Sequence, residues 1–187
     1  MKQLKLLKPT AKSYGGELLK TRKGRSTGRP LSTKDSMHLV LRSTKARGDW
    51  SFKKQGNEKK IRGIVEKFSV KYGVKVLSLG NVGNHLHFHI KLTHRAGYKP
   101  FIRAVTAAIA MAVTGTSRWT SKNQTKNGGG KRLKFWDYRP FTRVVQSFRA
   151  FLTLKDYIEV NQLEGLGVDR IDARFLIANK NSRPMLV

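Results

Sequence analysis

Residues 74–92 read VKVLSLGNVGNHLHFHIKL, and this stretch decides the predicted fold. Val74–Leu79 alternates in the manner of a strand, and His85–Leu92 is a second strand-like segment. Between them, Gly80–Gly83 supplies the turn. Two strands joined by a short glycine-containing turn predict an antiparallel hairpin.

The second strand of this hairpin carries histidines at alternate positions. Side chains two residues apart share a face of a strand, so His85 and His87 are predicted to lie side by side. Neutral imidazole is a strong ligand of transition metals, and the pair therefore suits two ligands of one divalent cation. An isolated His-x-His pair more often lines a polar sheet face and only hydrogen-bonds, so a metal site needs support from further residues.

The segments that flank the hairpin extend the pattern. The predicted elements are a strand over 37–42, a helix from about Asn57 ended by Gly73, a helix opened by Pro100 and ended by Gly115, a strand over 141–145, and a last helix to about Asn161. With the hairpin, this order predicts an α+β fold. It is the ferredoxin-like βαββαβ antiparallel sheet with helices on one face, plus a C-terminal helix. This superfold hosts many activities, so the fold alone leaves the function open.

Positive charge is the strongest compositional signal. Lys and Arg number 39 against 11 Asp and Glu, which leaves a formal net charge of +28 and a pI near 11.0. Nucleic acid is the usual partner of such a chain, because each phosphate that is neutralised releases condensed counterions. The charge does not distinguish an enzyme from a packaging or ribosomal protein.

Cysteine is absent from the sequence, which excludes disulfides and thiolate metal sites. No run approaches the roughly 20 apolar residues that a membrane span needs. The basic N-terminal residues also lack the apolar stretch of a secretory signal. We therefore expect a cytoplasmic protein with no membrane partner.

The chain divides into three predicted regions. Residues 1–30 are basic and interrupted by glycines, which indicates a flexible arm that either contacts DNA or only aids solubility. Residues 31–167 hold the predicted elements and form one domain, within which the basic, glycine-rich segment 116–131 is expected to be a mobile loop. Residues 168–187 are expected to be a C-terminal tail.

The predicted last helix carries a second group of polar residues. Tyr157 and Asn161 are four positions apart, so they lie one turn apart on one helix face. Phe151, Leu154 and Ile158 mark the inner face of this helix. The polar pair is expected to point away from that face. A tyrosine on such a helix is most often only packed and hydrogen-bonded.

Both groups of residues resemble one known family, the HUH endonucleases of the single-tyrosine transposase class. The motif Asn84-His85-Leu86-His87 is similar to the family's Asn-His-x-His motif. The family usually has an aliphatic residue where this chain has His89, which leaves His87 and His89 as an alternative pair. Asn84 fixes the register of the motif and favours His85 and His87.

The resemblance extends over roughly residues 36–167. It includes His38, in a strand similar to the family's opening strand, and the aromatic-to-basic stretch 136–145. The spacing from Tyr157 to Asn161 is similar to that of REP-associated tyrosine transposases, which have Asn where typical insertion-sequence relatives have Gln. Among the branches of the family, the chain therefore resembles the REP-associated one.

The resemblance implies a metal-dependent enzyme that nicks and rejoins single-stranded DNA, at hairpin-forming repeats of the REP kind. Tyr157 would attack the phosphodiester and form a 5′-phosphotyrosine. His85, His87 and the Asn161 carbonyl would hold one Mg²⁺ or Mn²⁺, ions that accept a mixed set of nitrogen and oxygen ligands. The resemblance also implies a prokaryotic, nucleoid-associated protein. It leaves open whether the protein is a monomer or a homodimer.

Basic and aromatic side chains near this site are expected to bind single-stranded or hairpin DNA. Cationic side chains would bind the backbone, and aromatic side chains would stack on unpaired bases. The predicted DNA-binding residues are Arg42, Lys131, Arg132, Trp136, Tyr138, Arg139, Arg143 and Arg149. For the neighbouring Phe135, packing in the core is the favoured interpretation.

Three other interpretations share parts of this pattern. A non-catalytic ferredoxin-like protein would bind DNA or RNA with the same charge, but it needs neither the histidine pair nor the phased Tyr157 and Asn161. A relaxase or replication initiator shares the chemistry but normally adds a helicase or origin domain. A retired transposase with a host role would keep the fold. Metal-dependent covalent capture by Tyr157 distinguishes an enzyme from a pure binding protein.

Overall fold

The computed structural model of the protein describes residues 13–16, 28–116 and 134–182. In chain order, the elements are β1 (Ser13–Tyr14), β2 (Ser36–Arg42), the 3-10 helix η1 (Gly48–Trp50), α2 (Gln55–Tyr72), β3 (Val74–Asn81), β4 (His85–Leu92), α3 (Arg95–Thr114), β5 (Phe141–Val145), α5 (Phe148–Gly165) and α6 (Arg170–Ser182). The strands form one antiparallel sheet in the order β1-β5-β2-β4-β3. Without β1, this is the strand order of a ferredoxin-like sheet, so the predicted fold class is confirmed.

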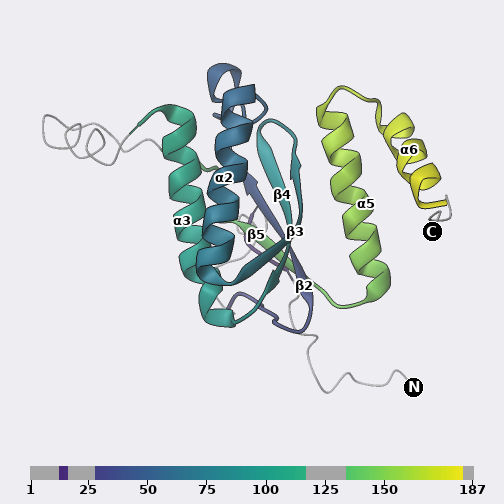
Figure 1. Cartoon of the computed structure of the whole chain (residues 1–187), viewed down its shortest axis with the longest axis horizontal. Coiled ribbons are helices and arrows are strands. Elements are labelled where there is room, and N and C mark those ends of the chain that lie inside the picture. Colours follow the sequence, from purple (N-terminus) through teal and green to yellow (C-terminus); the bar gives the residue numbers. More distant parts are fainter. Residues whose placement is uncertain (1–12, 17–27, 117–133, 183–187) are drawn as a thin grey trace, which may run out of the picture.

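The described helices lie on both faces of the sheet. α2 and α3 cover one face, as predicted, whereas α5 lies against the other face with α6 packed outside it (Figure 1). On the sheet, α5 contacts mainly β3 and β4. The histidine-bearing strand β4 is therefore covered on both sides, and the polar residues of the site lie between the sheet and α5.

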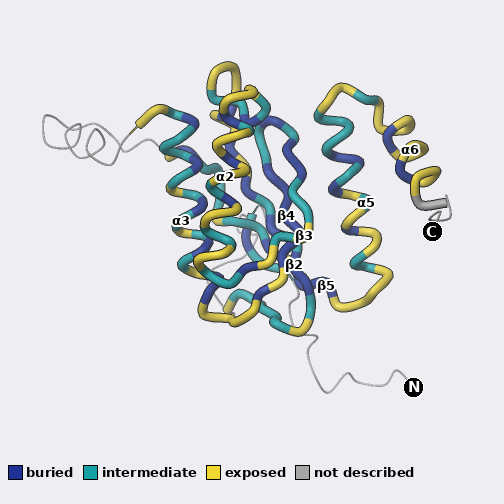
Figure 2. Tube along the Cα trace, in the orientation of Figure 1, coloured by how far each residue is buried: buried dark blue, intermediate teal, exposed yellow. Residues whose placement is uncertain are grey.

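The larger apolar core lies between the sheet and helices α2 and α3. On β2, Met37, Leu39 and Leu41 are almost fully buried in this layer. On β4 the predicted alternation is confirmed, because Leu86 and Phe88 are buried in the same cluster. Burial is strongest along the sheet (Figure 2). A slip of one residue would turn the histidines into this core, so the hydrophobic pattern fixes the register.

Helix α3 begins at Arg95, five residues before the predicted start at Pro100. Gly97 permits this start, because a Cβ there would lie 2.2 Å from the carbonyl oxygen of Tyr72 at the end of α2. Pro100 lies inside the helix, where its missing N–H costs one backbone hydrogen bond. Burial of Phe101 next to it helps to offset that cost.

Part of the predicted N-terminal arm belongs to the sheet. Strand β1 pairs with β5 and forms one edge of the sheet. Nη1 of the partly buried Arg29 donates to the carbonyl oxygen of Pro140 at 2.8 Å and to the hydroxyl of Thr142 at 2.7 Å. The Arg29 guanidinium also lies 4.4 Å from the ring centre of Tyr14. The prediction that all of 1–30 is a flexible arm is therefore wrong for these residues, since hydrogen bonds and a cation–π contact hold them on β5.

The predicted C-terminal tail, residues 168–187, contains helix α6. Ala173 and Ile177 lie one turn apart and are buried with Val160 of α5 in a small separate cluster. Lys180 Nζ lies 3.1 Å from a carboxylate oxygen of Glu159 on α5. The prediction of a tail is therefore wrong for this helix. Two buried side chains are too few to produce a clear helical pattern in the sequence.

The predicted mobile loop 116–131 lies outside the described residues, apart from Thr116. Within the described ranges, none of the helices combines the length and apolar character that crossing a membrane requires.

Candidate active site

The candidate site forms on the sheet face that α5 covers. Pairing of β2 with β4 places His38 opposite His89. It also places Arg42 opposite His85, with His87 between the two other histidines of β4 on the same face. Paired side chains lie on one face of a sheet, so four histidines and a guanidinium share this surface. The predicted placement of His85 beside His87 is confirmed.

Helix α5 approaches this surface where β3 lacks a side chain. A Cβ on Gly80 would lie 2.8 Å from Ile158 Cγ2 and 3.2 Å from the Ile158 carbonyl oxygen, closer than ordinary contacts permit. Gly80 pairs with His87 across the β3–β4 hairpin. The close approach of the helix therefore occurs beside the histidines, one residue from Tyr157.

Tyr157 lies over the histidines. Its ring centre is 5.4 Å from that of His87 and 5.9 Å from that of His38, and both contacts are edge-on. Tyr157 is 40% exposed, so it contacts the site and remains accessible from solvent. A side chain that attacks a bound substrate needs both properties.

Asn161 lies on the inner side of α5. It is 7% exposed, and its Nδ2 donates to the carbonyl oxygen of Tyr157 at 2.6 Å. Leu154 and Ile158, in the preceding turns, are buried on the same side. The expectation that the polar pair points away from the apolar face is therefore wrong. Because α5 packs on a polar part of the sheet, Asn161 belongs to the buried face and Tyr157 borders it.

Hydrogen bonds orient the two imidazoles of the motif. His85 Nδ1 lies 2.6 Å from Asn84 Oδ1, so Nδ1 carries the proton and Nε2 keeps its lone pair. His87 Nδ1 lies 3.1 Å from His38 Nε2. His87 Nε2 is buried and has no hydrogen-bond partner among the residues that the structure describes.

This donor set fits a divalent cation. A buried nitrogen without a partner is costly unless a ligand uses it, and the ring centres of His85 and His87 are only 4.8 Å apart. Within the described ranges, no group of three or more His, Asp or Glu side chains could hold a metal, so any third protein ligand beside His85 and His87 would be another type of residue. The amide oxygen of Asn161 could serve, because its nitrogen is already hydrogen-bonded.

Burial keeps these histidines neutral. Burial, together with the neighbouring His38 and His85, lowers the pKa of His87 to about 3. Burial also lowers the pKa of His38 to about 4, with His89 and Arg143 adding to the effect. Neutral imidazole is the form that binds metal, so protons do not compete for these nitrogens near neutral pH.

His89 occupies a different environment from His85 and His87. Its Nε2 lies 2.8 Å from the hydroxyl of Ser36, and its ring centre is 4.5 Å from that of Phe151. It is 1% exposed and packs beneath α5. Since its Nε2 is already hydrogen-bonded, the geometry favours His85 and His87 as the candidate metal ligands over the alternative pair.

The sequence is similar to a known protein family. A model of the family described as "Transposase IS200 like" matches residues 32–161, which is most of the chain and includes the whole candidate site. The chain belongs to the IS200-like transposase family. Among curated proteins, the sequence of this transposase has no significant match.

The fold of the transposase is also similar to solved structures. A REP-associated tyrosine transposase bound to a REP hairpin matches with a TM-score of 0.57 and 11% identity, over 75% of this chain and 74% of that chain. A Deinococcus radiodurans R1 protein described as a transposase matches with a TM-score of 0.40 and 17% identity, over 75% of this chain and 97% of that chain. At 11% identity, the likeness to the REP-associated transposase concerns the fold alone.

Two adjoining clefts of the transposase meet at Tyr157. The first, of about 500 Å³, is lined by His38, His85, His87 and Tyr157 together with the predicted DNA-binding residues Arg42, Tyr138 and Arg139. The second, of about 780 Å³, lies between β5 and the first half of α5 and is lined by the predicted Arg143 and Arg149. His38 and Tyr157 line both clefts. The tertiary structure thus gathers five of the predicted DNA-binding residues around the tyrosine.

Trp136, another predicted DNA-binding residue, lines neither of these clefts. Trp136 Nε1 donates to the carbonyl oxygen of Thr106 at 3.0 Å, and the indole packs on Phe52 and Phe135. This packing does not support the predicted stacking of Trp136 on bases. Phe135 is buried in the core, as favoured from the sequence. Lys131 and Arg132 lie outside the described residues.

The sequence predicts no functional role for two residues that the structure places at or beside the site. His38 was part of the family resemblance only, yet its imidazole contacts His87 and the ring of Tyr157. No pattern in the sequence indicates a role for Asp137, yet its carboxylate lies beside Arg42. Alternation along β2 could have placed His38 and Arg42 on one face, but only pairing with β4 shows which histidines they adjoin.

Proposed function

We propose that this transposase nicks and rejoins single-stranded DNA through Tyr157, with a 5′-phosphotyrosine intermediate, at hairpin-forming repeats of the REP kind. One observation carries the proposal. The accessible Tyr157 has its ring centre 5.4 Å from that of His87, in a cleft that Arg42 and Arg139 also line. A nucleophile, candidate metal ligands and phosphate-binding side chains therefore lie together.

In the proposed step, the Tyr157 oxygen attacks phosphorus and the bond from phosphorus to the 3′ oxygen breaks. The phenol gives up one proton and the leaving oxygen takes one up, so the products are a 5′-phosphotyrosine and a free 3′-hydroxyl. Attack by a 3′-hydroxyl in the reverse direction rejoins a strand, and no nucleotide cofactor is needed because the phosphotyrosine retains the bond energy. The close packing of Ile158 on Gly80 holds the tyrosine over the cleft.

His85, His87 and the Asn161 amide oxygen would hold Mg²⁺ or Mn²⁺. When bound, the ion would polarise the scissile phosphate and neutralise charge that develops on it. Asn84 holds His85 through Nδ1, and His38 contacts Nδ1 of His87. Each ligand nitrogen therefore has an orienting partner on the opposite side of its ring.

Charge and fold support DNA as the substrate. The net charge of +28 gives strong, salt-dependent attraction for phosphates, and Arg42 and Arg139 line the cleft at Tyr157. The spacing from Tyr157 to Asn161 is the feature that favours REP-like hairpins over other single strands. The REP-associated transposase with a similar fold is itself bound to a REP hairpin.

The direct test is covalent capture. The protein is incubated with Mn²⁺ and a panel of hairpin-bearing single strands that carry a label at either the 5′ or the 3′ end. Because the tyrosine takes the 5′ phosphate of the downstream fragment, only the 3′ label should migrate with the protein on a denaturing gel. Tyr157→Phe should abolish this adduct, whereas the control Tyr72→Phe on α2, across the sheet, should leave it intact.

Three results would contradict the proposal. An adduct that carries the 5′ label would reverse the assigned polarity. A peptide map that places the adduct on another tyrosine would remove Tyr157 from its role. Tight hairpin binding with no adduct from any strand of the panel would favour a pure binding protein with the same fold.

A further inference from the structure

Asp137 is an acidic residue at the edge of a cleft proposed to bind a polyanion. Acids are scarce in this chain, with 11 Asp and Glu against 39 Lys and Arg. The Asp137 side chain is only 13% exposed, and its Oδ2 lies 3.8 Å from Nε of Arg42. An acid at this place repels DNA, so its presence is better explained if it has another role.

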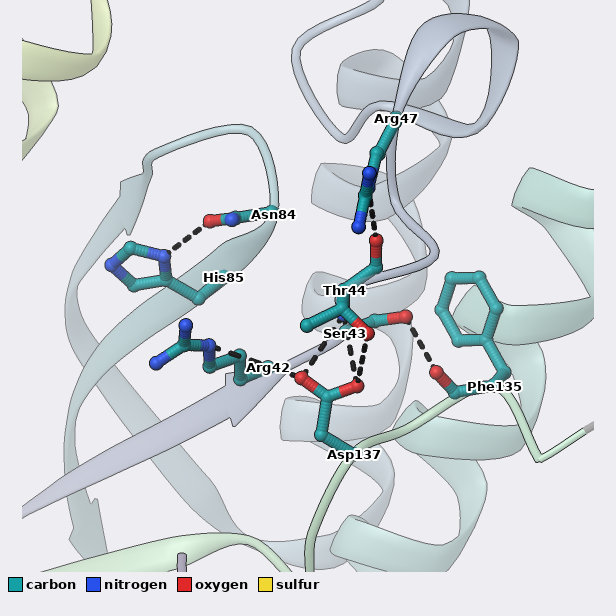
Figure 3. A network of polar contacts seen from close by, with 8 residues as sticks. All are labelled: Arg42, Ser43, Thr44, Arg47, Asn84, His85, Phe135 and Asp137. Carbon is teal, nitrogen blue, oxygen red and sulfur yellow. Dashed lines mark hydrogen bonds and ion pairs between the residues drawn. The ribbon is translucent and has the colours of Figure 1, made fainter. Parts of the chain in front are cut away.

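The carboxylate of Asp137 is held by the chain just after β2. Its Oδ1 and Oδ2 accept from the backbone N–H of Thr44 at 2.9 and 3.0 Å, and Oδ1 accepts from the Thr44 hydroxyl at 2.9 Å. The backbone N–H of Asp137 donates to the carbonyl oxygen of Arg42 at 3.0 Å. Ser43 adds a hydrogen bond to the carbonyl oxygen of Phe135 (Figure 3). Asp137 therefore has a fixed position relative to the last residue of β2.

Arg42 connects this network to the candidate active site. It is the cross-strand partner of His85, and its side chain lies between His85 and Asp137 in Figure 3. Arg42 lines the cleft at Tyr157 and also an adjoining cleft of about 400 Å³ that Lys45 and Lys134 line. Its side chain is 49% exposed, so the guanidinium can contact a ligand while Asp137 contacts it from the other side.

We infer that Asp137 is a positioning residue, which holds the Arg42 guanidinium against the path of the DNA strand so that it binds a backbone phosphate next to His85. The inference rests on the proposed function in taking single-stranded DNA as the ligand. Guanidinium binds a phosphate well only when its planar set of donors is aimed at it, and a neighbouring carboxylate restricts the side chain to one orientation. The strand would then continue toward Lys45 and Lys134.

A positioning role and simple charge repulsion predict opposite changes in DNA affinity when Asp137 is neutralised. If Asp137 only adds negative charge near DNA, Asp137→Asn should bind a single strand about twofold more tightly, since one repulsive charge is removed. If Asp137 positions Arg42, the same variant should bind roughly tenfold more weakly, because a charge-assisted phosphate contact is lost. Asparagine keeps one acceptor oxygen for Thr44, so the local hydrogen bonding is largely retained.

The experiment measures fluorescence anisotropy of a labelled random-sequence single strand with the full chain at fixed salt. The matched control is Glu66→Gln, which removes an equal charge from the exposed side of α2, on the other side of the sheet, and should change affinity by less than about twofold. Arg42→Ala should weaken binding, and adding Asp137→Asn to it should cause no further loss. Arg42→Lys, a substitution of an exposed side chain, should also lose affinity although the charge is kept.

Each outcome decides the inference. The inference is supported if Asp137→Asn weakens binding in the wild-type protein but has no further effect when Arg42→Ala is already present. Loss of affinity in Arg42→Lys also supports it. Tighter binding of Asp137→Asn, additive losses in the double variant, or unchanged affinity of Arg42→Lys would overturn it. Binding does not require cleavage, so a wild-type protein that binds and never forms an adduct would refute the proposed function and leave this test decisive.

Discussion

The close packing of α5 on the sheet should control the activity through Gly80. The change is Gly80→Ala, which adds one methyl group at the contact with Ile158. The side chain of Ile158 is 1% exposed and has no room to swing aside. One of the two atoms in the way is the backbone carbonyl oxygen of Ile158, so the helix itself has to move, and Tyr157 moves with it.

The expected magnitude follows from two opposing terms. Alanine in place of glycine gains about 0.5–1 kcal/mol in an unobstructed strand, because the unfolded chain loses conformational freedom. At Gly80 the methyl would lie 2.8 Å from Ile158 Cγ2, and forcing an extra carbon into a packed contact costs about 1–3 kcal/mol. We expect a net loss of about 1–2 kcal/mol in the free energy of unfolding. A shift of α5 by about 1 Å would lower the rate of cleavage by up to about 100-fold.

Urea unfolding and single-turnover cleavage of a labelled hairpin with Mn²⁺ measure the two effects. The matched control is Gly63→Ala on α2, where a Cβ would meet nothing within 4 Å. That substitution should gain about 1 kcal/mol from helix propensity and leave cleavage unchanged. Gly80→Ala with the stability and cleavage rate of the wild type would refute the reasoning. An equal loss of cleavage in Gly63→Ala would show that the effect is unrelated to α5.

Three further predictions concern individual side chains. His85→Ala and His87→Ala should each abolish Mn²⁺-dependent cleavage while DNA binding is retained. His89→Ala should instead lower the free energy of unfolding in urea by about 2–3 kcal/mol, because it empties a buried site. A stable but inactive His89→Ala variant beside an active His85→Ala variant would contradict this. Asn161→Ala should lose cleavage that a Mn²⁺ titration partly restores, and a failure of high Mn²⁺ to restore any would argue against a ligand role. Trp136→Phe should lower the free energy of unfolding by about 1 kcal/mol, because the hydrogen bond to Thr106 is lost, and should leave the affinity for a single strand unchanged. A tenfold weaker affinity would instead indicate that Trp136 stacks on bases.

The sequence by itself determined the elements and the face on which the histidines lie. The segment His85–Leu92 was predicted as a strand with the bounds that the structure shows. The reason is local: alternation of apolar residues sets one face of a strand in the core and the other outside it. The same local rule gave the order of elements and hence the ferredoxin-like sheet. Helix α3 departs from its prediction because the close contact between Gly97 and Tyr72 is not local.

The tertiary structure alone decided what surrounds the histidines. Nothing in the periodicity of α5 shows that it would pack on a polar part of the sheet, so Asn161 was assigned to the wrong side of the helix. Contacts that join distant segments, such as Arg29 with Thr142 and Arg42 with Asp137, leave no repeating signal in the chain. Helical and strand periods record only which residues of one segment share a face. Which face meets which, and at what distance, depends on the packing of all segments together.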